Sequence, residues 1–343
     1  MKRPWLAPLA PLYAAGLAMR WAGVTPARLS WPVVSVGNLS VGGTGKTPFT
    51  IALVELLQRE GVQVDVLSRG YGRKSGEPER VDPNGSAEQF GDEPLLIARK
   101  TGAPVYVARQ RYRAGRMAES AAARLSTSPR VHLLDDGFQH RQLHRDVNIL
   151  ILNRQDWFED SLLPGGDLRE PRSAIQRTTV IAISEDEPEI ESDLSRSIPG
   201  TSERPSWSGL AWPGPIWKFR REMVIPAIPE SLKTRPVVAF CGIARPGQFF
   251  DGLARHGMQV AASHAFPDHH PYTRADVEML LRLARTTGSG VLVTTVKDFV
   301  RLGDLGSALD GTMPLFAADL RIVFSEEAEV VRQLMTALRT PAS

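Results

Sequence analysis

Short apolar runs alternate with longer amphipathic segments along most of the chain. The apolar runs are rich in β-branched residues and predict strands at residues 33–36, 62–67, 105–108, 131–134, 147–152 and 179–184. Segments with helical spacing lie between several of them, at residues 47–59, 91–101 and 109–125. Repeated strand–helix units favour an α/β fold, in which helices cover both faces of a mostly parallel sheet.

A second series of strands and helices begins at residue 235. Its strands are predicted at 237–241, 258–262, 291–294 and 315–323, and its helices at 247–256, 274–285 and 326–338, with a short helix after Lys297 and Asp298. The Pro/Ser/Gly-rich stretch at 197–215 separates the two series, and residues 216–228 are predicted to form a strand or a hairpin. We therefore predict an N-terminal interfacial membrane helix at 1–31, a larger domain at 32–200, a linker with a possible β-hairpin at 201–234 and a smaller α/β domain at 235–343.

A glycine-rich stretch lies between the first predicted strand and the first predicted helix. Its glycines let the backbone approach an anion closely, and the following helix directs its first N–H groups at phosphates. Lys46 can reach the β- and γ-phosphates of a nucleotide, and the Thr47 hydroxyl suits Mg²⁺. We therefore predict a P-loop NTPase-like fold in the larger domain that binds ATP and Mg²⁺. The ATP-binding residues would be Ser40, Val41, Gly42, Gly43, Thr44, Gly45, Lys46 and Thr47.

This loop departs from two common patterns. The usual phosphate loop opens with glycine where this chain has Ser40, and the related loop of partition and metal-insertion ATPases usually has lysine where this chain has Val41. A plain glycine-rich turn is the alternative. The phosphate loop is favoured because a strand, the Gly-Lys-Thr sequence and an amphipathic helix occur in that order.

The bulk composition narrows the class of protein. The chain has 343 residues, of which 42% are apolar, enough for two domains with substantial cores. A single cysteine, Cys241, excludes an internal disulfide and suits a reducing compartment. The formal net charge of +3 does not call for a nucleic-acid partner, and the spacing of Cys and His does not match a structural zinc site.

Residues 1–31 are apolar, with basic and aromatic residues near both ends. The run is too short and too often interrupted by proline for a membrane span, which needs about 20 apolar residues. A signal peptide is disfavoured because a nucleotide-binding loop follows and no clear cleavage site is present. A helix packed on its own domain is the remaining alternative to a helix in the membrane interface. The interface is favoured by Lys2, Arg3, Arg20 and Arg28, with Trp5, Tyr13, Trp21 and Trp31.

Two pairs of carboxylates are candidates for the chemistry. Asp135 and Asp136 directly follow an apolar strand, where a carboxylate can hold Mg²⁺ beside the phosphates; a turn or a helix cap is the alternative. Asp92 and Glu93 begin a predicted helix. They either cap that helix or face the active site from the carboxyl edge of the sheet, where such folds bind ligands.

Other polar residues are candidates for substrate binding. Gln139 and His140 follow the Asp135 strand and project near the same edge. Arg69 and Tyr71 follow another strand and could grip an anionic or sugar substrate.

The loop at residues 266–272 is dense in histidine. His269 and His270 could titrate near neutrality. Because adjacent side chains point in different directions, a two-histidine metal site is disfavoured, and a surface turn is the alternative.

Six motifs together resemble one known family. They are Gly37-Asn-Leu-Ser-Val-Gly-Gly-Thr-Gly-Lys-Thr-Pro48, Ser68-Arg-Gly-Tyr-Gly72, Gly91-Asp-Glu-Pro94, Asp135-Asp-Gly-Phe-Gln-His140, Pro164-Gly-Gly-Asp-Leu-Arg-Glu-Pro171 and Phe266-Pro-Asp-His-His-Pro-Tyr272. Their order and spacing over essentially the whole chain are similar to those of the tetraacyldisaccharide 4′-kinases, or lipid A 4′-kinases. In this family Ser40 is no departure.

The resemblance implies an activity and a location. The enzyme would use ATP and Mg²⁺ to phosphorylate the 4′-hydroxyl of a tetraacyl-glucosamine disaccharide 1-phosphate, the lipid A precursor. It would be peripheral or monotopic on the cytoplasmic face of the inner membrane, with no nucleic acid and no obligate protein partner.

The resemblance also implies roles for individual residues. It suggests an Asp–His pair that accepts the sugar proton, which we map to Asp92 and His269, with His270 as the alternative. Lys46 would be catalytic through its charge. The metal shell would comprise Thr47, Glu93, Asp135 and Asp136, and the substrate site Arg69, Tyr71, Gln139 and His140.

Two other functions fit parts of the sequence. One is a membrane-docked P-loop ATPase of the partition or metal-insertion type, against which Val41 and the N-terminal run argue. The other is a nucleotide switch without enzymatic activity. Phosphorylation of an added disaccharide lipid distinguishes the kinase from both.

Overall fold

A computed structural model describes residues 4–122, 128–158, 161–195, 212–229, 232 and 235–339. The strands are β1 (Val33–Gly37), β2 (Gln63–Ser68), β3 (Glu79–Arg80), β4 (Val105–Val107), β5 (Arg130–Leu134), β6 (Val147–Leu152), β7 (Val180–Ser184), β8 (Ile216–Val224), β9 (Val237–Cys241), β10 (Val260–Ala265), β11 (Val291–Thr295) and β12 (Leu315–Phe324). The 3₁₀ helices are η1 (Pro4–Leu9) and η2 (Arg172–Arg177). The α-helices are α1 (Ala10–Trp21), α2 (Lys46–Arg59), α3 (Ala87–Phe90), α4 (Asp92–Thr101), α5 (Arg111–Ala121), α6 (Arg154–Phe158), α7 (Pro188–Ser195), α9 (Pro246–Arg255), α10 (Arg274–Thr286), α11 (Val296–Leu302), α12 (Asp304–Asp310) and α13 (Glu327–Arg339).

The strands form one sheet in the order β10-β9-β11-β12-β8-β7-β6-β1-β5-β2-β4-β3. Neighbours from β8 to β4 are parallel, as are β10, β9, β11 and β12. The antiparallel pairs are β3 with β4 and β8 with β12. The predicted α/β fold with a mostly parallel sheet is therefore confirmed.

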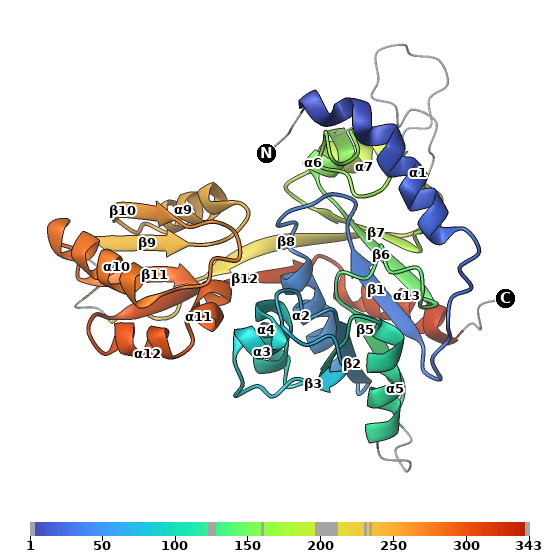
Figure 1. Cartoon of the computed structure of the whole chain (residues 1–343), viewed down its shortest axis with the longest axis horizontal. Coiled ribbons are helices and arrows are strands. Elements are labelled where there is room, and N and C mark those ends of the chain that lie inside the picture. Colours follow the sequence, from blue (N-terminus) through green and yellow to red (C-terminus); the bar gives the residue numbers. More distant parts are fainter. Residues whose placement is uncertain are drawn as a thin grey trace.

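Helices cover both faces of the larger half of the sheet (Figure 1). Val34 and Val36 of β1 point into a core shared with α2 and α4. Val33 points to the opposite face, where α5 packs. Burial on both faces explains why β1 has β-branched residues at successive positions instead of alternating apolar and polar ones.

β8 and β12 join the two halves of the sheet (Figure 1). β8 pairs with β7 up to Phe219 and with β12 from Phe219 to Val224, so residues 216–224 form one strand. α13 follows β12 but packs against α2 and β6, which places Val330 and Leu334 in the core of the larger half. The predicted stretch at 197–215 falls mostly on residues outside those described. The domain boundaries at 32–200 and 235–343 stay a prediction.

The N-terminal segment lies on the outside of the larger half (Figure 1). α1 has no buried residues, and Trp5, Leu12 and Met19 are 73%, 70% and 74% exposed. Among the residues that the structure describes, every helix is too short or too polar to span a bilayer. Lys2 and Arg3, named above for the interface, precede the described residues.

Candidate active site

The glycine-rich loop joins β1 to α2 at the carboxyl edge of the parallel sheet. β1 is buried over its whole length. Gly42 and Gly45 have φ angles of +111° and +84°, which favour glycine because a side chain is strained there. α2 begins at Lys46, directly after Gly45, so its first N–H groups face the loop. The backbone therefore has the local geometry that a phosphate-binding loop requires.

The Lys46 ammonium group lies between two acceptors at this edge. Its Nζ is 2.9 Å from Asn38 Oδ1 and 3.6 Å from Asp136 Oδ1. Asn38 in turn donates from Nδ2 to the Ser40 carbonyl oxygen at 2.8 Å. The amide of Asn38 thus fixes both the start of the loop and its lysine.

Asp135 and Asp136 follow β5, next to the loop, and their pKa values are shifted in opposite directions. Burial raises the pKa of Asp135 to about 7, and the charges of Glu93 and Asp136 add to the effect. Thr50 of α2 donates to Asp135 Oδ1 at 3.0 Å. Desolvation also opposes ionisation of Asp136, but the charges of Lys46 and Arg169 outweigh it and hold its pKa at about 2. The edge therefore carries crowded carboxylates, one ionised and one that readily takes a proton.

Asp92, at the first position of α4, is buried against the smaller half of the sheet. Its Oδ2 lies 3.1 Å from His269 Nδ1 and 2.6 Å from Arg301 Nε. Lys297 is 3.9 Å from the same oxygen and 2.9 Å from Glu93. Burial opposes ionisation of Asp92, but the hydrogen bond from His269 and the charges of Lys297 and Arg301 prevail and hold its pKa well below the usual range.

The backbone selects between the two adjacent histidines. His269 has a φ of +59° and its N–H donates to the Gly242 carbonyl oxygen at 3.1 Å. This conformation turns its ring to Asp92. The ring of His270 instead stacks on Phe266, with Nε2 3.1 Å from Asp276 Oδ2. His269 is therefore the histidine that pairs with Asp92.

A buried carboxylate, that of Asp298, accepts several hydrogen bonds beside the Asp92–His269 pair. Asp298 Oδ1 accepts from Gly242 N at 2.9 Å, from Tyr272 Oη at 3.0 Å and from Arg301 Nη1 at 2.9 Å. The loop that carries His269 and the arginine that holds Asp92 are thus tied to one group.

The predicted substrate residues surround the same edge. The Tyr71 and His269 ring centroids are 5.3 Å apart, and Tyr71 is 62% exposed. Gln139 Nε2 donates to the Asn38 carbonyl oxygen at 2.8 Å. Burial lowers the pKa of His140 to about 3, and four nearby cations add to the effect: Arg111, Arg145, Arg20 and Arg69. His140 and Arg69 thus belong to one cationic cluster, which includes Arg20 of α1.

Several residues of this site were not singled out from the sequence. They are Asn38, Arg111, Arg169, Lys297 and Arg301. In the sequence, Lys297 and Arg301 look like solvent-exposed residues of a short helix, and Arg111 looks like a residue near the start of another helix. A signal was present for Asn38 and Arg169, since Asn38 lies in the Gly37–Pro48 motif and Arg169 in the Pro164–Pro171 motif.

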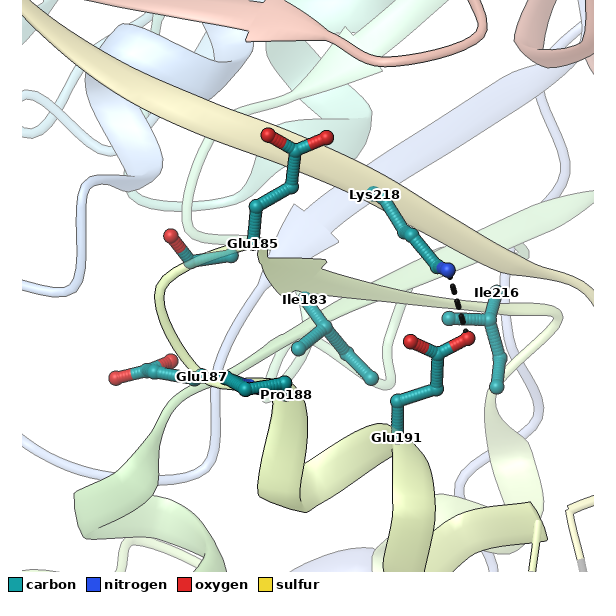
Figure 2. Close-up of a pocket in the computed structure, with 8 residues that line it drawn as sticks. Ile183, Glu185, Glu187, Pro188, Glu191, Ile216 and Lys218 are labelled. Atoms are coloured by element: carbon teal, nitrogen blue, oxygen red, sulfur yellow. Dashed lines mark ion pairs between the residues drawn. The ribbon is translucent and has the colours of Figure 1, made fainter.

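A separate cavity of about 190 Å³ lies between β7, β8 and α7 (Figure 2). Three glutamates, Glu185, Glu187 and Glu191, line it together with one lysine, Lys218, which is 2.8 Å from Glu191. Because the lining carries an excess of negative charge, it disfavours phosphate-bearing ligands. The cavity is therefore not part of the candidate site.

Comparison with known proteins gave consistent matches over nearly the whole chain. The model of the family described as tetraacyldisaccharide-1-P 4′-kinase matches residues 2–339. The tetraacyldisaccharide 4′-kinase of Koribacter versatilis is 42% identical over 328 residues, covering 92% of this chain and 93% of that protein. The protein of the same name from Desulfotalea psychrophila is 34% identical, covering 86% and 84%. The crystal structure of LpxK from Aquifex aeolicus in complex with ATP is similar with a TM-score of 0.72 and 32% identity, covering 97% of this chain and 98% of that one.

Proposed function

This chain belongs to the tetraacyldisaccharide-1-P 4′-kinase family, and we propose that it transfers the γ-phosphate of ATP to the 4′-hydroxyl of a tetraacyl-glucosamine disaccharide 1-phosphate, a step in lipid A biosynthesis. The observation that carries the proposal is the continuity between the phosphate loop and the Asp–His pair. Lys46 forms an ion pair with Asp136, and the charge of Glu93 is near enough to Asp135 to raise its pKa. Glu93 adjoins Asp92, whose partner is His269. A nucleotide on the loop and a hydroxyl beside His269 would therefore meet at one edge.

His269 is the proposed general base, and Asp92 orients it. An ionised carboxylate has no proton to donate, so the proton in the contact with Asp92 sits on His269 Nδ1. The lone pair of Nε2, which lies 4.0 Å from Asp268 Oδ1, can then accept a proton. Asp92 itself is a weak base because the hydrogen bond from His269 and the charges of Lys297 and Arg301 hold its pKa low. Its negative charge would stabilise the imidazolium that forms when the sugar hydroxyl loses its proton.

The phosphate loop would supply the charge for phosphoryl transfer. Lys46 would neutralise charge on the transferring group, which is the main requirement of this chemistry. Thr47, Asp135, Asp136 and Glu93 offer oxygen ligands, and the carboxylate crowding that raises the pKa of Asp135 would be relieved by a cation. Within the described residues no group of three or more His, Cys, Asp or Glu side chains could hold a metal by itself. That fits Mg²⁺, which usually takes one or two carboxylates and completes its shell with phosphates and water; when bound, it would neutralise charge on the phosphates.

The cationic cluster around His140 suits the 1-phosphate of the acceptor. Arg111 is 7% exposed, and burial lowers its pKa to about 10, so it stays protonated at neutral pH. Guanidinium groups bind phosphate oxygens in a bidentate manner. The cluster therefore offers an anion site beside the catalytic edge.

The N-terminal segment would hold the enzyme against the lipid surface. Trp5, Leu12 and Met19 face outward, and such side chains favour the membrane interface. Tyr13 donates to the Arg169 carbonyl oxygen at 3.0 Å, and Arg169 Nη1 lies 2.9 Å from Asp136. We propose peripheral binding to the cytoplasmic face of the inner membrane, with the acyl chains near α1 and the sugar beside Asp136.

The test is a kinase assay with purified full-length protein, ATP, Mg²⁺ and the tetraacylated disaccharide 1-phosphate in detergent micelles. We expect a bisphosphorylated lipid whose new phosphate is on the 4′-oxygen, and ADP in equal amount. ADP release that does not depend on the lipid would contradict the proposal and favour a P-loop ATPase of the partition or metal-insertion type.

A further inference from the structure

β8 carries side chains past the carboxyl edge of the larger half of the sheet. Its pairing with β7 ends where Phe219 lies opposite Ser184, the last residue of β7. Because β7, β6 and β1 are parallel, this edge is also the one at which β1 leads into the phosphate loop. Residues 220–224 therefore run beyond that edge, toward the smaller half (Figure 1).

One face of β8 points at α2 and the other does not. Trp217 and Phe219 are buried, and the ring of Phe219 meets Phe49 of α2 edge-on at a centroid distance of 5.4 Å. Alternation along a strand puts Arg221 on the same face, one step nearer the loop. Arg220 lies on the opposite face and is paired with Glu222 at 2.5 Å.

Arg221 lies at the N-terminus of α2. Its Nε is 3.6 Å from the position that a Cβ on Gly45 would occupy, and its Cζ is 5.2 Å from the Phe219 ring centroid. The N-terminus of a helix carries a partial positive charge. A guanidinium group beside it is therefore placed unfavourably until an anion binds between them.

Few compensating charges are nearby. Burial lowers the pKa of Arg221; Glu187 and Asp186 oppose this effect, while Arg245 adds to it. No ion pair or hydrogen bond joins its guanidinium to any residue in the described part of the chain. Five N–H donors thus lie partly out of water at the mouth of an anion-binding loop.

We propose that Arg221 donates hydrogen bonds to the phosphate chain of ATP on the loop and acts in cis as the arginine that stabilises the charge formed during transfer. The inference rests on the proposed kinase function. In the transfer, the bond from the γ-phosphorus to the oxygen it shares with the β-phosphate breaks, and a bond from the 4′-oxygen to the γ-phosphorus forms. The hydroxyl proton passes to His269, and Arg221 stays protonated and forms no covalent bond. Negative charge on the oxygens of the transferring phosphoryl group is what the guanidinium would stabilise.

The test compares Arg221→Met with Arg220→Met in full-length protein. Met keeps an apolar stem against Phe219 but removes the charge. We expect Arg221→Met to lower kcat by about 10²–10³-fold, while its ADP affinity changes by less than about threefold. The second readout is titration of ADP and Mg²⁺ with and without aluminium fluoride, a mimic of the transferring phosphoryl group. Aluminium fluoride should tighten ADP binding in the wild type and in Arg220→Met but not in Arg221→Met. The tightening in Arg221→Lys should be intermediate.

Equal fluoride-dependent tightening in the wild type and Arg221→Met would overturn the role of Arg221. So would an Arg221→Lys variant, used if the Met variant does not fold, whose kcat and fluoride response match those of the wild type. A wild type that binds ADP and fluoride but does not phosphorylate the disaccharide would instead contradict the proposed function, because the titration needs no lipid.

Discussion

Asp92 Oδ2 and His269 Nδ1 lie 3.1 Å apart although 177 residues separate them in the chain. Asp92 begins a helix of the larger half, and His269 lies on a loop of the smaller half. The contact is supported by Lys297, which bridges to Glu93 at 2.9 Å, and by Arg301, at 2.6 Å from Asp92. Each half of the sheet thus contributes one residue of the Asp92–His269 pair, and the two residues are in contact in the structure.

The first prediction follows from this shared interaction. Asp92→Ala and His269→Ala should each lower kcat by about 10²–10⁴-fold, the usual value of general-base assistance. The double variant should be little worse than the poorer single one, because both changes remove the same transition-state interaction. Steady-state kinetics on the four proteins measures the coupling.

His270→Ala is the matched control for this cycle. Its ring contacts Asp276 and Phe266, so we expect a milder effect on kcat. Strictly additive losses for Asp92 and His269 would mean that they act independently. A severe defect in His270→Ala with a silent His269→Ala would move the role to the neighbouring residue.

The second prediction concerns the loop lysine. Lys46→Ala should reduce turnover by at least about 10²-fold, because the charge on the transferring phosphate loses its nearest cation. The circular dichroism spectrum should not change, since Lys46 Nζ bonds to Asn38 and does not pack in a core. Arg59→Ala, at the far end of α2 with a side chain that is 60% exposed, should keep wild-type turnover. A folded Lys46→Ala protein with normal turnover would show that the phosphate-loop assignment is wrong.

Local features of the fold were predictable because short stretches determine them. The β-branched run of β1, Gly42 and Gly45 lie within about one turn of the elements that they define. Long-range features were not. Residues 216–228 fitted either a strand or a hairpin, and only pairing with β7 on one side and β12 on the other makes β8 one strand. Likewise, nothing in the helical spacing of α13 says that Val330 and Leu334 pack on the larger half.

In the candidate site, too, local features were predictable from the sequence and long-range contacts were not. The motifs pointed to the carboxylates and histidines, since few residue types can do this chemistry. They did not point to Arg301, because 209 residues separate it from Asp92 and its i,i+3 pair with Asp298 reads as ordinary helix stabilisation. The choice between His269 and His270 depends on a backbone φ of +59°, which two adjacent identical residues cannot specify.

The third prediction is a pair of opposite pH dependences of stability. The folded pKa of Asp135, about 7, lies above the ordinary aspartate pKa of 3.8, so its contribution to stability is complete below about pH 4 and is lost as pH rises to about 7. Asp136 has a folded pKa of about 2, so its contribution is present above about pH 4 and is lost as pH falls to about 2. Relative to the wild type, Asp135→Asn should therefore become more stable as pH rises from about 4 to 7. Asp136→Asn should be less stable than the wild type above about pH 4, and this difference should disappear as pH falls to about 2.

Urea unfolding of the wild type and both variants across this pH range, without Mg²⁺, is the measurement. The adjacent positions act as controls for each other. If the two difference curves slope in the same direction, the electrostatic account of the pair is wrong.

The fourth prediction concerns the membrane. Leu12→Glu and Met19→Glu should weaken sedimentation with anionic vesicles and raise the apparent KM for the lipid, because each puts a charge on the exposed apolar side of α1. Met117→Glu is the control, since Met117 is 36% exposed on α5, away from α1 in Figure 1. Removal of residues 1–22 should have the larger effect. Equal vesicle binding by all these proteins would count against an interfacial role.

The fifth prediction separates binding of the 1-phosphate from stability at Arg111. Its guanidinium is buried, Nη1 donates to the Arg109 carbonyl oxygen at 3.2 Å, and the like charge of Arg69 is nearby. Burying such a charge is costly, so Arg111→Met should unfold at the same temperature as the wild type or a higher one. It should also raise the KM for the disaccharide 1-phosphate by about tenfold or more, since a charge-assisted phosphate contact is lost.

Arg113→Met is the matched control for this variant. Arg113 lies on the same helix with a side chain that is 50% exposed and paired with Glu77 at 2.7 Å, so its loss should change neither quantity. The decisive comparison uses a disaccharide without the 1-phosphate. If Arg111 binds that group, the wild type and Arg111→Met should have the same KM for this acceptor. If the variant is as defective with it as with the 1-phosphate, Arg111 acts instead through the nearby Asp136, whose charge is the largest charge effect on its pKa.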